Sequence, residues 1–252
     1  MPETVYKNLV RSVDDYVQSD IIIDIAVGQK CIGVRTRHGI GLTYVTGEAW
    51  ERASQIGPES AETSCRGAPL SGIVPRYLED DPLYTAIALA ALNSLHIEKG
   101  EDDPRDWFRD LGRKRRLGMV GYFCPIMDRI ALSLIEPVIF ELRDIPGTYG
   151  PERAPELLPT CDAVLITGAT FANKTVHHYL PHIAPDADAC IFGHSTPLAD
   201  FLLERFTLGA TRIPRDGSPI SNADEAFRLI RRGGNIRELK PFTRKVIRRT
   251  KT

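Results

Sequence analysis

The chain has 252 residues, of which 42% are hydrophobic and 26% are charged, and its formal net charge at pH 7 is -1. This composition excludes disordered and fibrous classes and leaves room for two hydrophobic cores of roughly 100 to 150 residues each. The near-zero charge gives no general electrostatic reason to expect a nucleic acid or an anionic membrane as partner.

Five cysteines occur at wide spacing without a C-x-x-C motif, and neither a signal peptide nor an apolar run of membrane-spanning length is recognisable. We therefore expect a cytoplasmic protein with free thiols and no membrane partner. Cys161 and Cys190 lie at or in expected buried strands, where cysteine acts as a small hydrophobic residue.

Residues 1–105 predict an N-terminal α+β domain. Apolar residues recur at helical spacing within 4–20, and the apolar run 21–28 follows as a strand. Residues 31–36 and 40–45 flank a short turn and predict an antiparallel hairpin.

Short helices are expected at 48–55 and 69–78, in a stretch rich in Gly, Pro and Ser. Asp81 and Pro82 are typical of an N-cap and a first helical turn, and the helix that they start runs to Leu95. This helix is apolar nearly all round, so we expect it to be buried between the hairpin layer and a second layer.

The charged stretch 98–116 predicts a linker with a short helix at 107–111, after which residues 106–252 form the second domain. Strands and helices alternate from there. The expected strands are 116–121, 137–143, 162–168, 189–193 and 210–215, and the expected helices end near Leu134, Leu158, Leu180, Phe206 and Arg232. Short apolar strands separated by helices predict a Rossmann-like domain with a parallel sheet of about five strands, covered on both faces.

Three turns in this half combine glycine with polar or aromatic residues, at 121–124, 168–175 and 193–197. Each follows an expected parallel strand. Because the carboxyl ends of such strands meet at one edge of the sheet, backbone amides there can hold a small polar or anionic ligand. We therefore expect one ligand-binding crevice at this edge, facing the N-terminal half.

Gly121 stands where a dinucleotide-binding domain carries G-x-G-x-x-G, but the motif is not matched. This glycine either permits a close ligand contact or only turns the chain, and Tyr122 and Phe123 offer a flat aromatic wall. Glu141 lies 20 residues further on, where a nucleotide-binding protein has the acid that binds ribose hydroxyls; a capping role is the alternative. A nucleotide-cofactor-dependent oxidoreductase or transferase is therefore the alternative function.

The second turn is the most polar of the three. Gly168 opens it, and Thr170 and Asn173 either cap the following helix or direct polar groups to a ligand. Lys174 adds a cation close to the expected helix start, which would favour a bound anion.

In the third turn, Gly193 to Pro197, Pro197 fits a first helical turn and Ser195 or Thr196 its N-cap. His194 is a candidate acid, base or metal ligand, because its ordinary pKa of about 6.5 permits each role at neutral pH. The turn lacks the final glycine of G-x-S-x-G, which argues against a serine hydrolase.

Five segments together carry a family resemblance: AALNSL at 90–95, GMVGYF at 118–123, FELR at 140–143, LITGATFANKT at 165–175 and GHSTPL at 193–198. Over essentially its whole length the chain is similar to two-domain proteins proposed to chelate heavy metals, which have an enolase-N-terminal-like domain followed by a Rossmann-like domain. The resemblance implies a cleft between the two domains, closed by first-domain residues such as Asn93. No enolase chemistry is implied, because the likeness concerns only the fold of the first domain.

The resemblance further implies that the cleft binds or modifies a small polar or anionic compound that can chelate a metal, and it leaves open whether the protein is an enzyme. Cys124 and His194 stand where the family more often has proline, and both are soft or borderline ligands that suit a transition-metal ion or a metal chelate as cofactor. Two such residues without a third do not define a metal site. Cys124 is also a nucleophile candidate if it begins a helix, although an unreactive cysteine is the alternative.

Other partners follow from less specific signals. Residues 237–251 hold seven basic residues against one acidic residue, which would add affinity for phosphates. No recognition motif accompanies them, so we expect a frayed basic terminus rather than a nucleic-acid site. A homodimer is left open by the sequence.

Overall fold

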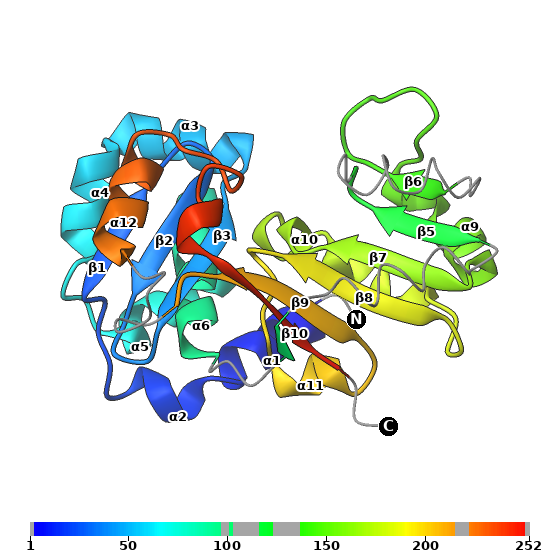
Figure 1. Ribbon diagram of the computed structural model, residues 1–252, viewed down its shortest axis with the longest axis horizontal. Helices are drawn as coiled ribbons and strands as arrows, with labels where there is room; N and C mark the ends of the chain where they lie inside the picture. Colours follow the sequence, from blue (N-terminus) through cyan, green and yellow to red (C-terminus); the bar gives the residue numbers. More distant parts are fainter. Residues whose placement is uncertain (1–2, 97–100, 103–115, 123–136, 215–221, 250–252) are drawn as a thin grey trace.

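The computed structural model describes residues 3–96, 101–102, 116–122, 137–214 and 222–249 (Figure 1). A three-stranded antiparallel sheet in the first half is followed by a seven-stranded, mostly parallel sheet in the second half. This arrangement confirms the predicted α/β class. The expected linker helix at 107–111 and the helix ending at Leu134 lie outside the described residues.

The first half follows the predicted order closely. Its elements are α1 (Glu3–Arg11), α2 (Asp14–Val17), β1 (Asp24–Val27), β2 (Cys31–Arg35), β3 (Ile40–Tyr44), α3 (Gly47–Ile56), α4 (Pro58–Cys65), α5 (Leu70–Ile73), the 3-10 helix η1 (Val74–Leu78) and α6 (Pro82–Leu95). The hairpin of β2 and β3 is confirmed, with Ile32 opposite Thr43. Helix α4 was not expected.

Helix α6 begins and packs as its sequence indicates. The Asp81 carboxylate accepts hydrogen bonds from the backbone amides of Leu83 (3.0 Å) and Tyr84 (3.1 Å), which makes Asp81 the N-cap. A Cβ atom at Gly41 would lie 2.0 Å from the carbonyl oxygen of Ala90, so only glycine lets β3 approach the helix this closely. The apolar core around α6 continues into the second half, so the helix is buried between two layers, as expected.

The second half is built around the sheet ordered β4-β10-β9-β8-β7-β5-β6. Its strands are β4 (Glu101–Asp102), β5 (Leu117–Val120), β6 (Val138–Phe140), β7 (Ala163–Thr167), β8 (Asp188–Gly193), β9 (Thr207–Arg212) and β10 (Arg244–Arg248). Five of them, β5 to β9, are parallel, which agrees with the expected number. No helix among the described residues is both long and apolar enough to cross a membrane.

Short helices connect these strands. They are η3 (Pro151–Arg153), α9 (Ala154–Leu157), η4 (Leu158–Thr160), α10 (Ala169–Ala172), η5 (Val176–His178), η6 (Leu180–His182), α11 (Asp200–Leu203), α12 (Ala223–Arg231) and η7 (Lys240–Phe242). The predicted continuous helix to Leu180 is wrong. It ends at Ala172 because Asn173 Oδ1 accepts a hydrogen bond from the amide of Thr175 and Lys174 adopts a positive φ of 53°.

Two further expectations about the second half are wrong. The helix after β8 begins at Asp200 rather than Pro197, because the carbonyls of His194 and Thr196 accept hydrogen bonds from Arg212 instead of entering a helical turn. Neither Ser195 nor Thr196 is therefore an N-cap. The basic terminus is not frayed where it is described, since β10 pairs antiparallel with β9.

Helix α12 packs on the first sheet although the sequence groups it with the second half. It lies across β1 and β2 (Figure 1), where Phe227 and Ile230 join the core formed by that sheet. Arg231 Nε lies 2.9 Å from Glu62 Oε2, and Arg231 Nη2 donates to the carbonyl of Ile25 (2.6 Å). The antiparallel sheet is thus covered by α6 on one face and by α12 on the other.

Candidate functional site

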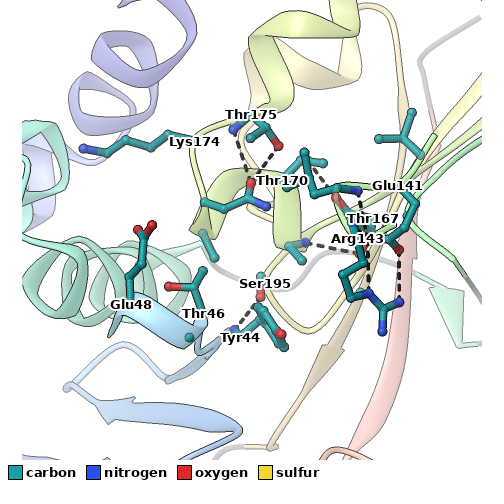
Figure 2. Close-up of a pocket in the computed structure, with 18 of the residues that line it drawn as sticks. Tyr44, Thr46, Glu48, Glu141, Arg143, Thr167, Thr170, Lys174, Thr175 and Ser195 are labelled. Atoms are coloured by element: carbon teal, nitrogen blue, oxygen red, sulfur yellow. Dashed lines mark hydrogen bonds and ion pairs between the residues drawn. The ribbon is translucent and has the colours of Figure 1, made fainter. Parts of the chain in front are cut away.

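A cavity of about 840 Å³ lies between the two halves, at the carboxyl ends of β5, β6, β7 and β8 (Figure 2). The end of β3 and the starts of α3 and α6 form its opposite wall. The predicted site residues that line it are Gly121, Tyr122, Glu141, Thr170, Asn173, His194 and Ser195. The three predicted turns therefore meet in one pocket that faces the N-terminal half.

The pocket occupies a distinctive point of the sheet. The parallel strands run in the order β6-β5-β7-β8-β9, so the chain proceeds outward in opposite directions from β5 and from β7. Open α/β sheets bind ligands at such a reversal of strand order, outside the carboxyl ends of the strands. Gly121 after β5 and Thr167 at the end of β7 line the cavity at this reversal.

Gly121 is required by the turn itself. Its φ is 90°, and a Cβ atom there would lie 2.7 Å from Thr167 Cγ2. Its amide donates to the carbonyl of Phe140 (2.8 Å), which fixes the turn against β6. Glycine thus allows β5 to end directly beside β7 with the backbone exposed to the cavity.

Glu141 ties the first turn to the segment after β6. Its carboxylate accepts hydrogen bonds from the amides of Tyr122 (3.1 Å), Leu142 (2.9 Å) and Arg143 (3.2 Å), and from the Arg143 guanidinium (3.3 and 3.1 Å). Burial raises the pKa of Glu141, but these bonds, led by the Arg143 side chain, hold it below its ordinary value. Because a carboxylate has about four acceptor positions, none is left for the ribose hydroxyls of a nucleotide.

In the second turn, polar side chains bind their own loop. Thr170 Oγ1 donates to the carbonyl of Thr167 (2.7 Å), and Asn173 Oδ1 accepts from the amide and the hydroxyl of Thr175 (3.2 and 2.7 Å). Gly168 does not line the pocket. A Cβ atom there would lie 2.6 Å from the amide nitrogen of Thr196, so this glycine lets the second and third turns pack together.

The third turn joins the two halves. Ser195 Oγ accepts a hydrogen bond from the amide of Tyr44 at the end of β3 (2.7 Å; Figure 2). Asn93 does not line the pocket; its Nδ2 donates to the carbonyls of Leu42 (2.9 Å) and Ser195 (3.3 Å). Thr196 is buried behind the pocket wall. Asn93 and Ser195 therefore hold β3, α6 and the third turn in one arrangement.

A buried cation supports this turn from behind. Arg212 is 1% exposed, and its guanidinium donates to the carbonyls of His194 (3.1 Å) and Thr196 (2.6 Å). Burial lowers the pKa of Arg212 to about 9. Burial, followed by the charge of Arg212, lowers the pKa of His194 to about 4, so the imidazole is neutral at pH 7.

His194 lines the pocket and contains a buried polar atom without a partner in the described ranges of the chain. Its Nε2 is buried and has no hydrogen-bond partner among the described residues. In a neutral imidazole, each nitrogen can either donate or accept one hydrogen bond, depending on the tautomer, and the unprotonated nitrogen can donate a lone pair to a metal. In the described part of the chain, no group of three or more His, Cys, Asp or Glu residues is placed to hold a metal ion.

Phe123 and Cys124 lie outside the described residues, so their predicted roles stay predictions. The other cysteines are free and buried, and burial raises the pKa of both Cys161 and Cys190. This environment fits the small hydrophobic role expected for those two.

A wall from the first half was expected, but the residues that form it were not predicted. Tyr44, Thr46, Glu48 and Asp80 line it, and Tyr44 is 40% exposed. The side chain of Thr46 accepts a hydrogen bond from the amide of Ala49 and so caps α3. A helix start and a strand end are readable locally, but their position opposite the parallel strands depends on the tertiary fold.

Comparisons with known proteins identify relatives of this chain. The family model DUF364, described as "Putative heavy-metal chelation", matches residues 103–249, and DUF4213, with the same description, matches residues 10–96. A DUF364 protein of unknown function from Desulfitobacterium hafniense superposes with a TM-score of 0.76 at 19% sequence identity, and one from Pyrococcus horikoshii with 0.72 at 15%. Both alignments cover 98% of each chain. No curated protein matches.

Proposed function

The chain belongs to the DUF364 family, and we propose that it binds a small metal-chelating compound, together with its heavy-metal ion, in the pocket between its two halves. The observation that carries this proposal is the cavity of about 840 Å³ at the reversal of strand order. Its size falls within the range of small-molecule sites, roughly 300 to 1,000 Å³.

The composition of the walls favours a chelate over a bare ion as cargo. A protein that holds a heavy-metal ion directly needs three or four His, Cys, Asp or Glu side chains converging on one point. The described residues contain no such group. In this proposal the chelator supplies the donor atoms, and His194 lines the pocket with its imidazole neutral.

The pocket is also suited to hold a ligand in a fixed orientation. Ser195 and Asn93 lock the third turn to the first half, and Glu141 locks the first turn to the segment after β6. Because these bonds are already made without a ligand, little ordering is needed when one binds.

A blocked pocket provides the test. Gly47 lines the cavity, and a Cβ atom added to it would meet nothing within 4 Å; Gly72 has the same open space away from the cavity. We expect Ni²⁺ and Cu²⁺ complexes of citrate, nitrilotriacetate or histidine to raise the Tm of the wild-type protein and of Gly72→Phe, but not of Gly47→Phe. At a hundredfold excess over Kd the rise should be about 5 to 10 °C.

Two results would count against the proposal. One is an unchanged Tm of the wild-type protein with all of these complexes. The other is an equal rise in Gly47→Phe. NADH and S-adenosylmethionine belong in the same experiment, and we expect no shift with either, because the acceptor positions of Glu141 are filled.

A further inference from the structure

Lys174 has an unusual backbone conformation in the pocket wall. Its φ of 53° makes it the one non-glycine residue with a positive φ in the part of the chain that the structure describes. A side chain in this region costs about 1 to 2 kcal/mol, and such strained positions concentrate at functional sites. Here the strain places a lysine side chain along the cavity.

The ammonium group of Lys174 is only partly satisfied. Nζ donates to the backbone carbonyl of Glu79 in the first half and lies 5.9 Å from the centre of the Tyr77 ring. No ion pair joins it to a carboxylate of the described residues. Two of its three N–H donors are therefore available.

Among the described residues that line the pocket, Arg143 is a second cation, and its charge is already paired. The guanidinium of Arg143 lies 3.1 Å from the Glu141 carboxylate, and Figure 2 shows this pair on the opposite side of Ser195 from Lys174. Burial lowers the pKa of Lys174, and the charges of Asp80 and Glu79 offset part of that effect. A partly buried ammonium whose acceptor is a neutral carbonyl still has a charge that can attract an anion in the pocket.

We propose that the chelator carries an anionic oxygen group, a carboxylate or a phosphate, and that Lys174 anchors this group in the pocket. This inference rests on the proposed function of the pocket. An ammonium attracts an oxyanion more strongly than a neutral carbonyl, because the oxyanion carries a full negative charge, so the ammonium gains when an oxyanion joins or replaces the Glu79 carbonyl. Asp80 lines the same pocket and its charge acts on Lys174, so its carboxylate weakens anion binding by repulsion.

Isothermal titration calorimetry tests this role with two kinds of variant: one removes the positive charge of Lys174, and the other removes a negative charge near it. The probes are the anionic Ni²⁺–citrate complex, the neutral Ni²⁺ complex with two histidines, and inorganic phosphate. Lys174→Met should weaken binding of Ni²⁺–citrate about tenfold or more while leaving the neutral complex within about twofold. Lys174→Arg should retain most of the affinity, and Asp80→Asn, which removes a carboxylate whose charge acts on Lys174, should increase it.

Lys30→Met is the matched control, because Lys30 is exposed in the turn between β1 and β2, away from the pocket. Thermal unfolding of each variant verifies folding, and Lys174→Arg covers the case in which Lys174→Met does not fold. If the wild-type protein binds neither complex, both the proposed function and this inference are overturned. If it binds both and loss of the Lys174 charge changes neither affinity, only the inference is overturned. Phosphate binding that also depends on Lys174 would identify phosphate as an accepted oxyanion.

Discussion

Replacing Gly121 with alanine should destabilise the protein through two separable effects. The new Cβ atom would force an L-residue into a positive φ of 90°, which costs about 1 to 2 kcal/mol. It would also lie 2.7 Å from Thr167 Cγ2, and overpacking of this kind costs about 1 to 3 kcal/mol. We therefore expect Gly121→Ala to lower the free energy of unfolding by about 2 to 5 kcal/mol.

The variant Thr167→Ser separates the two effects, because it deletes the methyl group that clashes but keeps the hydroxyl that accepts from the amide of Ala169. In that background the closest contact of the new Cβ atom would be with Cβ of residue 167 at 3.1 Å, so Gly121→Ala should cost mainly the backbone strain, about 1 to 2 kcal/mol. Urea unfolding of the wild-type protein, both single variants and the double variant measures each difference. A cost below about 0.5 kcal/mol, or a cost that Thr167→Ser does not diminish, would refute the explanation.

Two further predictions concern buried polar groups. The pKa of His194 is about 4 in the folded protein and about 6.5 in the unfolded chain, so below pH 6.5 the unfolded chain binds the proton more readily. The free energy of unfolding should therefore fall by at most about 2 kcal/mol between pH 7 and pH 5 because of this group. Urea unfolding of His194→Gln at both pH values should lack that part of the fall. Tyr77→Phe leaves the buried carbonyl of Phe171 without its donor at 2.8 Å and should cost about 1 to 2 kcal/mol in thermal unfolding; an unchanged Tm would mean that this bond contributes nothing.

Features with a local cause could be predicted from the sequence. The cap at Asp81 and the apolar surface of α6 depend on neighbouring residues, and both are confirmed. The meeting of Gly121, Thr170 and Ser195 follows from a general rule, because the carboxyl ends of adjacent parallel strands share one edge. Their pattern identifies the place of the pocket without identifying what each side chain does there.

The missed features depend on partners distant in the sequence. Ser195 was expected to cap a helix, but its hydroxyl accepts from the amide of Tyr44, which lies in another sheet. The Arg212 side chain donates hydrogen bonds to the carbonyls of His194 and Thr196, which therefore do not enter a helical turn. No sequence pattern around residue 212 indicates these contacts. Glu48 and Asp80 reach the pocket only because α6 packs the first half against the strand ends.

The position of α12 affects how the chain folds during synthesis and whether its two halves can be expressed as separate fragments. Apolar surface on β1 and β2 is shielded by a helix that is synthesised about 190 residues later. A fragment that ends after α6 would expose this apolar surface to water, and exposed apolar surface promotes aggregation. On the ribosome, the first sheet cannot bury its outer side until residues 223–231 have emerged, so the order of synthesis limits any attempt to express either half separately.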